Sequence, residues 1–418
     1  MRFPRCSRAL LVASSLLAAS SFVPVIGSSF VSAAHAEDQL SAKVGKPLQE
    51  AQTALGAKNY AKAMSAVNAA DAIPGKTDYE KYTIAQMRAA VAASSGDVAA
   101  ASKAYDVLIA SPRTPAAAKQ QMLMANATMA YNAKDYARAV PAIERYMKIA
   151  GPTAQMQTLL VQSYYLQQDY KNAARVQQDQ INAEIKAKRV PAENQLQFLA
   201  TCYHQMKDSA NETHAYVLLA KYYSKPDYWA MLIHNLAADP QMPDALQFNL
   251  ERLRMTTGVL KDPSDYMDMV ERAVQSGLPQ LGLNLMNQAY ASGALGKDAG
   301  AAREARLKAM VVKRAAETKA TLAADADAAR KMPTAAPSLT AGYNLVLNGQ
   351  VDAGLALMRE GLAKHPTAPE GAKLQYGMAQ MDGGRTADAI KTFADVHGDH
   401  GSQDLAQLWT LLLTKPSK

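Results

Sequence analysis

The sequence has very little cysteine. Cys6 and Cys202 are its two cysteines among 418 residues, and Cys6 lies in a basic N-terminal segment with the features of an export signal. Once that segment is removed, Cys202 is the single thiol of the mature chain. An intramolecular disulfide is then excluded even in an oxidising compartment. The fold must therefore be stabilised by packing alone.

Aromatic and charged residues are also scarce. Aromatics make up 6% of the chain, with 19 Tyr against 6 Phe and 2 Trp, and charged residues make up 20%. The shortage of large rings indicates thin helix–helix layers packed through alanine. A hydrophobic content of 49% excludes disorder by composition. Because alternating β-branched residues are rare as well, an all-α chain is predicted.

The first 36 residues have the parts of a signal peptide. A head with arginines at positions 2, 5 and 8 precedes a largely apolar stretch, and Ala34-His35-Ala36 has the small-x-small pattern of a cleavage site. Cleavage after Ala36 predicts a periplasmic or secreted protein. Serines and Pro24 interrupt the apolar stretch, which disfavours a retained anchor. Losing three arginines and no acid lowers the net charge from +8 to +5, too mild an excess to indicate nucleic-acid binding.

One sequence motif occurs twice in the middle of the chain. Tyr131-Asn-Ala-Lys-Asp-Tyr136-Ala-Arg-Ala139 is followed by Tyr165-Leu-Gln-Gln-Asp-Tyr170-Lys-Asn-Ala173. In each copy a helical run ends at a polar turn, and Asp-Tyr begins a second helix. Tyr136 and Tyr170 lie 34 residues apart, which is the period of the tetratricopeptide repeat (TPR).

Small residues recur at two positions in most of nine such units between 42 and 398. The two positions face each other across a helix pair, where only Gly, Ala or Ser lets the axes approach to about 8–10 Å. The clearest pairs are Ala51 with Ala63, Ala89 with Ala101, Ala127 with Ala139, Gly342 with Gly354, and Gly377 with Ala389. The fourth and fifth units depart from this pattern, with Val161 and Glu212 at one of the two positions.

This pattern resembles the TPR family over nearly all of 42–398. The resemblance implies an all-α, TPR-type helical-repeat solenoid, a right-handed superhelix of antiparallel helix pairs. The predicted organisation is a signal peptide at 1–36, an N-terminal TPR-like solenoid at 37–297, a long or degenerate helical segment and linker at 298–334, a C-terminal TPR pair at 335–398, and a capping helix and tail at 399–418.

The chain is also similar to exported bacterial TPR proteins whose genes often lie beside those of TonB-type energy-transducing systems. The sequence segments that resemble those proteins are Ser163-Tyr164-Tyr165 with Asp169-Tyr170, Tyr228-Trp229, Asp265-Tyr266 before Ser276-Gly277-Leu278-Pro279, and Asp404-Leu405-Ala406-Gln407-Leu408-Trp409. These are helix-packing residues, so they imply relatedness more securely than a shared role.

The TPR resemblance also implies a partner-binding site on the first helix of each central pair, which lines a concave groove. The side chains expected there are polar, uncharged and aromatic, which suits hydrogen bonding to an extended peptide. They are Thr128, Tyr131, Gln162, Tyr165, Gln197, Thr201 and His204. An alternative is that the tyrosines simply pack against neighbouring turns, and the sequence leaves both interpretations open.

Two pairs of residues raise the question of catalysis or metal binding. Cys202 and His204 lie two residues apart on a predicted helix and point about 200° away from each other, so an inert buried thiol is expected. His397 and His400 have a spacing that can ligate a metal in a turn, but without a second cluster a solvated loop is expected. No phosphate loop or nucleophile motif occurs. We therefore expect no metal, no cofactor and no enzymatic activity.

The sequence favours a non-enzymatic periplasmic TPR scaffold that binds a protein or peptide in its groove, within a TonB-type envelope transport system. The expected partners are that protein or peptide and an inner-membrane transport complex, with no nucleic acid and no small-molecule cofactor. The alternative is an envelope polysaccharide or outer-membrane assembly factor, built on the same solenoid.

Overall fold

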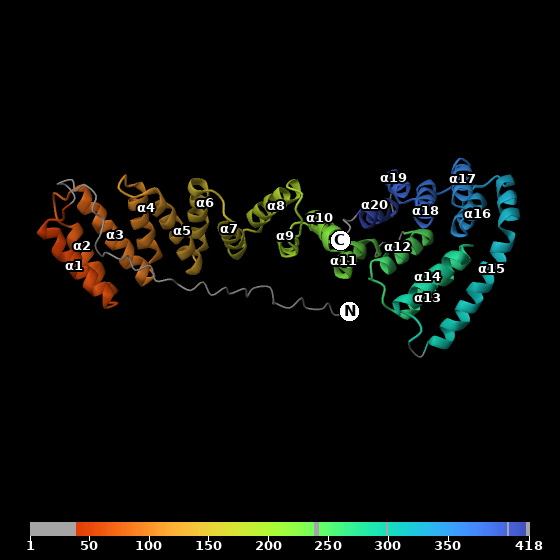
Figure 1. Cartoon of the computed structure of the whole chain (residues 1–418), viewed down its shortest axis with the longest axis horizontal. Helices are drawn as coiled ribbons and strands as arrows, with labels where there is room; N and C mark the ends of the chain where they lie inside the picture. Colours follow the sequence, from red (N-terminus) through yellow and green to blue (C-terminus); the bar gives the residue numbers. More distant parts are fainter. Residues whose placement is uncertain (1–38, 238–241, 298–299, 399–400, 415–418) are drawn as a thin grey trace. The chain divides into compact units, whose positions relative to one another are not determined.

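The computed structural model describes residues 39–237, 242–297, 300–398 and 401–414 (Figure 1). In these ranges the regular structure consists of 20 α-helices, with no strand. The predicted all-α helical-repeat fold is therefore confirmed. The signal peptide predicted at 1–36 and the capping tail after 414 lie outside the described residues. Among the helices described, none is both long and apolar enough to cross a membrane.

The helices divide into two compact units, one up to Met122 and one from Leu123 onward. The first unit contains α1 (Ala42–Gly56), α2 (Tyr60–Asp71), α3 (Asp78–Ser95), α4 (Val98–Ala110) and the start of α5 (Ala116–Asn132). The second contains the rest of α5, then α6 (Tyr136–Ala150), α7 (Ala154–Leu166), α8 (Tyr170–Lys186), α9 (Glu193–Gln205), α10 (Ser209–Tyr223), α11 (Pro226–Ala237), α12 (Asp244–Thr256), α13 (Pro263–Gln275), α14 (Pro279–Ser292), α15 (Ala301–Lys331), α16 (Ala335–Leu347), α17 (Val351–Leu362), α18 (Pro369–Asp382), α19 (Thr386–Ala394) and α20 (Ser402–Leu413).

In the first unit, α1 pairs with α2 and α3 pairs with α4, while α2 packs against α3. Ala51 of α1 and Ala63 of α2 are fully buried, as is Val67 one turn further along α2. These are the small-residue positions identified in the sequence. The close crossing of α1 and α2 follows from them, because a larger side chain at either position would hold the helices apart.

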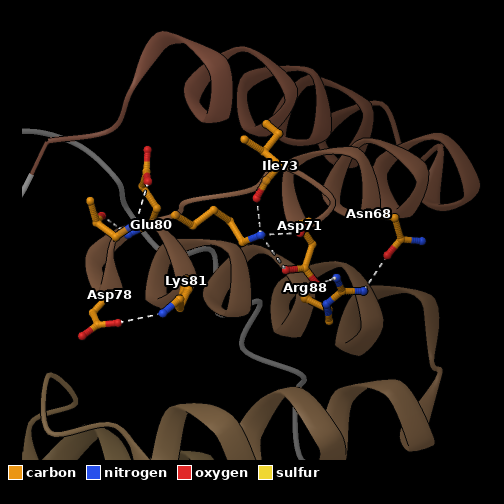
Figure 2. A network of polar contacts seen from close by, with 9 residues as sticks. Asn68, Asp71, Ile73, Asp78, Glu80, Lys81 and Arg88 are labelled. Carbon is orange, nitrogen blue, oxygen red and sulfur yellow. Dashed lines mark hydrogen bonds and ion pairs between the residues drawn. The ribbon is translucent and has the colours of Figure 1, made fainter.

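Polar contacts join the start of α3 to the N-cap of α1 and the middle of α3 to α2, and Figure 2 shows the contact between Arg88 and Asp71. The Glu80 carboxylate accepts hydrogen bonds from the backbone N–H of Thr77 at 2.9 Å and of Ser41 at 3.0 Å, and the Thr77 hydroxyl accepts from the Glu80 N–H. This capping box fixes the start of α3. In the middle of α3, Arg88 forms an ion pair with Asp71 of α2 at 2.8 Å.

In the second unit, consecutive helices again pair, and the turns between them repeat one another. Asp135 and Asp169 are the N-caps of α6 and α8, and their carboxylates accept hydrogen bonds from the third residue of each helix. The residue before each cap has a left-handed backbone, with φ of 60° at Lys134 and 67° at Gln168. The predicted Asp-Tyr helix starts are thus confirmed, because a carboxylate satisfies an otherwise unpaired backbone N–H.

Helices α16 and α17 of the second unit cross closely. A Cβ added to Gly342 would lie 2.7 Å from the carbonyl oxygen of Gly354 and 2.6 Å from Cγ of Met358. A Cβ added to Gly354 would lie 2.4 Å from the Gly342 carbonyl oxygen. The two glycines therefore occupy the predicted small-residue positions for a steric reason, since no other side chain fits between the backbones.

The last helix does more than cover the final helix pair. Helix α20 contacts α18 and α19, but it also contacts α10 and α12, which precede it by many helices (Figure 1). Helices α10–α20 therefore form a closed assembly within the second unit. This closure differs from the simple end cap predicted at 399–418, where a last helix would only shield the preceding pair.

A buried polar cluster joins three helices of the closed assembly. The guanidinium of Arg252 (α12) donates to both carboxylate oxygens of Asp382 (α18), at 2.8 and 3.0 Å, and to the hydroxyl of Tyr343 (α16) at 3.0 Å. The Tyr343 hydroxyl in turn donates to Asp382. Burial lowers the pKa of Arg252, but the charge of Asp382, the contact with Tyr343 and the hydrogen bonds to both residues together outweigh this effect, and the net pKa is raised. The Arg252 guanidinium therefore stays charged.

The segment predicted at 298–334 contains one continuous helix, α15, of 31 residues. It buries a stripe that includes Leu307, Val311 and Leu322, and it packs against α14 and α16. Residues 332–334 separate it from α16, which begins at Ala335. The domain boundaries drawn from the sequence stay predictions.

The first prediction concerns acid sensitivity at the start of α3. Hydrogen bonds from Ser41 and from the Thr77 backbone lower the pKa of Glu80 from 4.5 to about 2. A carboxylate whose pKa is lowered by folding stabilises the folded state at pH values above its unfolded pKa. This stabilisation is lost as the pH falls through the folded pKa. Glu80→Gln should therefore speed amide hydrogen exchange in α1 and α3 at pH 7, and the difference from wild type should fade between pH 4.5 and about 2. A constant difference across that range would contradict this assignment.

The second prediction concerns the α16–α17 crossing. Gly342→Ala should lower the free energy of unfolding of the second unit by about 1–3 kcal/mol, because the added methyl overlaps the backbone of α17. Gly371→Ala in α18 is the matched control, since its Cβ would lie 3.9 Å from the nearest atom, Cβ of Ala368. That control should leave stability unchanged or raise it by up to about 1 kcal/mol. Equal midpoints of urea unfolding for the two variants would refute the steric argument.

The third prediction concerns the closure. Asp382→Asn should lower the free energy of unfolding of the second unit by about 3–5 kcal/mol, because it leaves the buried Arg252 charge without its partner. Asp388→Asn in α19 removes an exposed ion pair to Lys391, three residues later on the same helix, and should change stability by less than about 0.5 kcal/mol. Hydrogen exchange in α12 and α20 is the measurement. Unchanged protection of those helices in Asp382→Asn would show that the cluster does not hold the closure.

Candidate partner-binding site

Hydrogen bonds between alternate helices connect several of the predicted site residues. The hydroxyl of Tyr131 on α5 donates to Oε1 of Gln162 on α7 at 2.7 Å. Two pairs later, Nε2 of Gln197 on α9 donates to the hydroxyl of Tyr228 on α11 at 2.6 Å. Each bond joins the first helix of one pair to the first helix of the next.

An aromatic contact joins the two helices between these bonds. The ring of Tyr165 on α7 lies 5.1 Å from that of Phe198 on α9, measured between centroids. Tyr165 also meets Tyr170 edge-on at 5.2 Å, and Tyr131 meets Tyr136 in the same way at 5.8 Å. The first helices of four consecutive pairs are thus linked in series. We call this surface the tyrosine–glutamine face, made of Tyr131, Gln162, Tyr165, Gln197, Phe198 and Tyr228.

The rings of this face are half-buried, except for that of Tyr228, which is buried. Burial raises the pKa of Tyr131 and of Tyr165, and the neighbouring tyrosine on the second helix raises each further. Burial also raises the pKa of Tyr228, as does its hydrogen bond to Glu193. These hydroxyls stay protonated at neutral pH, so they act as neutral hydrogen-bonding groups.

The remaining predicted site residues lie on the same helices but make local contacts. The hydroxyls of Thr128 and Thr201 donate to carbonyl oxygens one turn earlier in their own helices. His204 is exposed, and its Nδ1 lies 3.1 Å from the Glu212 carboxylate on α10. Glu212 stands where most units have a small residue, so its carboxylate meets the preceding helix at this place.

Sequence reasoning missed part of this surface. Phe198 and Tyr228 complete it, and Glu193 binds both Tyr228 and Lys225 at the α9–α11 junction. The interval from Gln197 to Tyr228 is 31 residues, the same as from Tyr131 to Gln162. That repeated spacing of Tyr and Gln is the signal that could have identified Tyr228.

Cys202 has the surroundings expected of an inert thiol. It is fully buried, and burial raises its pKa to about 12. The part of the chain that the structure describes contains no group of three His, Cys, Asp or Glu residues placed to hold a metal ion. His400, one half of the predicted His397–His400 pair, lies outside the described residues.

The glutamines of the face retain hydrogen-bonding capacity after their contacts are made. Gln162 uses Oε1 for Tyr131, which leaves both N–H groups of its amide. Gln197 uses Nε2 for Tyr228, which leaves its oxygen and one N–H. The face therefore offers neutral donors and acceptors beside aromatic rings, which is the combination that an extended peptide backbone requires.

No family model and no curated protein match this sequence. Among solved structures, one similarity is to yeast Tom70, at 11% identity over 88% of this chain and 95% of that chain, with a TM-score of 0.22. Another is to the complex of the TPR2AB domain of yeast Sti1 with pHSP90, at 11% identity over 70% of this chain and 97% of that chain, with a TM-score of 0.21.

The class of fold follows from the chain's own helices. Antiparallel helix pairs succeed one another along the chain, and small residues are buried where the helices of a pair cross. The chain is therefore an all-α helical-repeat protein.

Proposed function

We propose that this protein is a non-enzymatic scaffold that binds an extended segment of a partner protein along the tyrosine–glutamine face. The observation that carries the proposal is the series of contacts across α5, α7, α9 and α11, which holds half-buried rings and free amide groups in fixed positions. Preformed surfaces of this kind bind with a smaller loss of conformational freedom.

The chemistry of the face favours a peptide over a charged ligand. Tyr131, Gln162, Tyr165 and Gln197 are all neutral, and the charges of Glu193 and Lys225 cancel each other at 2.6 Å. Aromatic rings supply contact area at a low cost in side-chain entropy. A peptide backbone can satisfy the remaining amide groups while its apolar side chains contact the rings.

We further propose that this binding takes place in the periplasm, because the first 36 residues have the pattern of an export signal. The similarity to exported TPR proteins encoded beside TonB-type systems makes a component of an inner-membrane transport complex the first partner class to test. An envelope polysaccharide or outer-membrane assembly role is the alternative.

The test is a comparison of three forms of the tagged mature protein expressed in the periplasm. Tyr131→Ala with Tyr165→Ala removes two rings of the face and should weaken capture of the partner at least about tenfold, as loss of aromatic anchors does. Tyr222→Ala, on the second helix of its pair, is the control and should capture as wild type does. Helicity measured by circular dichroism should be the same in all three.

Two results would contradict the proposal. Loss of helicity in the double variant would show that the tyrosines are core residues. Capture of polysaccharide or outer-membrane barrel precursors, in place of a discrete protein partner, would favour the alternative function.

A further inference from the structure

The first half of α15 has an exposed surface on which positive charge dominates. Between residues 301 and 319, one acid, Glu317, is exposed against five exposed basic residues, which are Arg303, Arg306, Lys313, Arg314 and Lys319. We call these five the basic surface of α15. The second half of the helix is balanced, and its charged residues are Asp325, Asp327, Arg330 and Lys331. A concentration of one charge sign attracts ions of the other sign within about one Debye length.

The chain itself neutralises little of this charge. Glu317 lies 3.5 Å from Arg314 and 4.0 Å from Lys313, so one acid is shared by two basic groups. Within the described residues, the other three basic side chains of the surface form no ion pair. The remaining acid of this half, Glu304, is buried and accepts a hydrogen bond from the Gly296 backbone N–H at 2.7 Å. The basic surface therefore keeps most of its positive charge for a partner.

Two large apolar side chains are exposed among the basic ones. Met310 is 39% exposed and Val312 is 45% exposed. Arg306, Met310 and Lys313 follow one another at steps of four and three residues, so they share one side of the helix. Neither Met310 nor Val312 belongs to the buried stripe of α15, so the packing of this helix does not account for them.

An anionic bilayer matches this combination better than a soluble acidic polymer does. Its surface has negative headgroups above an apolar layer, so it accepts basic and apolar side chains together. Arginine and lysine side chains are long enough to place their charged ends among the headgroups while their stems contact apolar surface. An acidic polymer in water would bind the charges alone and would leave Met310 and Val312 exposed.

We propose that the basic surface of α15 binds the surface of a membrane that contains anionic phospholipids. The helix lies along the bilayer without crossing it, and Met310 and Val312 enter the headgroup layer. This surface belongs to a different helix from those of the tyrosine–glutamine face, so the proposal does not depend on the proposed function of that face.

The test is co-sedimentation with lipid vesicles. It uses the chain without its first 36 residues, because their apolar stretch would bind lipid by itself. Binding to vesicles of one part phosphatidylglycerol and two parts phosphatidylcholine should be at least about tenfold tighter than binding to phosphatidylcholine alone, and added salt should weaken it. Equal binding to the two kinds of vesicle, or binding to neither, would overturn the proposal.

Two double variants with the same loss of charge separate this surface from the net charge of the chain. Arg306→Gln with Lys313→Gln should weaken binding to the anionic vesicles roughly 10–30-fold, since each basic side chain at such a membrane contributes about fivefold. Arg330→Gln with Lys331→Gln is the control in the balanced half, where Arg330 is already paired with Asp327 at 3.1 Å. It should weaken binding by less than about threefold. Equal losses in the two double variants would refute the assignment to the basic surface.

A methionine variant distinguishes a bilayer from an acidic polymer. Met310→Ser should weaken binding to the anionic vesicles at least about threefold, because it removes apolar contact with the headgroup layer. Met332→Ser is the matched control, an exposed methionine just after the last residue of α15, and should bind as wild type does. Poly-glutamate in solution should bind more weakly than the vesicles. Tighter binding to poly-glutamate, or unchanged vesicle binding in Met310→Ser, would show that the surface recognises an acidic polymer instead.

Discussion

The close approach of antiparallel helices at positions without a large side chain is the constraint on which the rest of this structure depends. Ala51 and Ala63 meet in the first unit, and Gly342 and Gly354 meet in the second, where backbone atoms leave no room for a Cβ. Because the chain has little aromatic bulk and no disulfide partner for Cys202, many thin contacts of this kind must stabilise it together. They also fix the helices that carry the surface side chains.

Much of the local fold could be predicted from the sequence. The alanines and glycines at crossing positions, and the aspartates that cap α6 and α8, act over a few residues, so their spacing is visible in the chain. The closure could not be predicted in this way. Arg252 lies 91 residues from Tyr343 and 130 from Asp382, and no periodic pattern links such distant positions. Only the folded arrangement brings α12, α16 and α18 together.

The candidate site could also be predicted only in part. The repeat register placed Tyr131, Gln162, Tyr165 and Gln197 on the first helices, but it could not tell which of them would touch. The structure shows contacts between successive pairs that hold the rings against their neighbours and leave those of Tyr131 and Tyr165 half-exposed. Packing is therefore observed, and the binding role stays a proposal.

The most direct test of the account is site-specific photocrosslinking in the periplasm. A photoreactive residue at His204, exposed on the first helix of its pair, should crosslink to one protein partner. The same residue at His214, exposed on the second helix of that pair, should not. Crosslinking to the same partner with equal yield from both positions, or from His214 alone, would contradict the claim that the first helices form the binding surface.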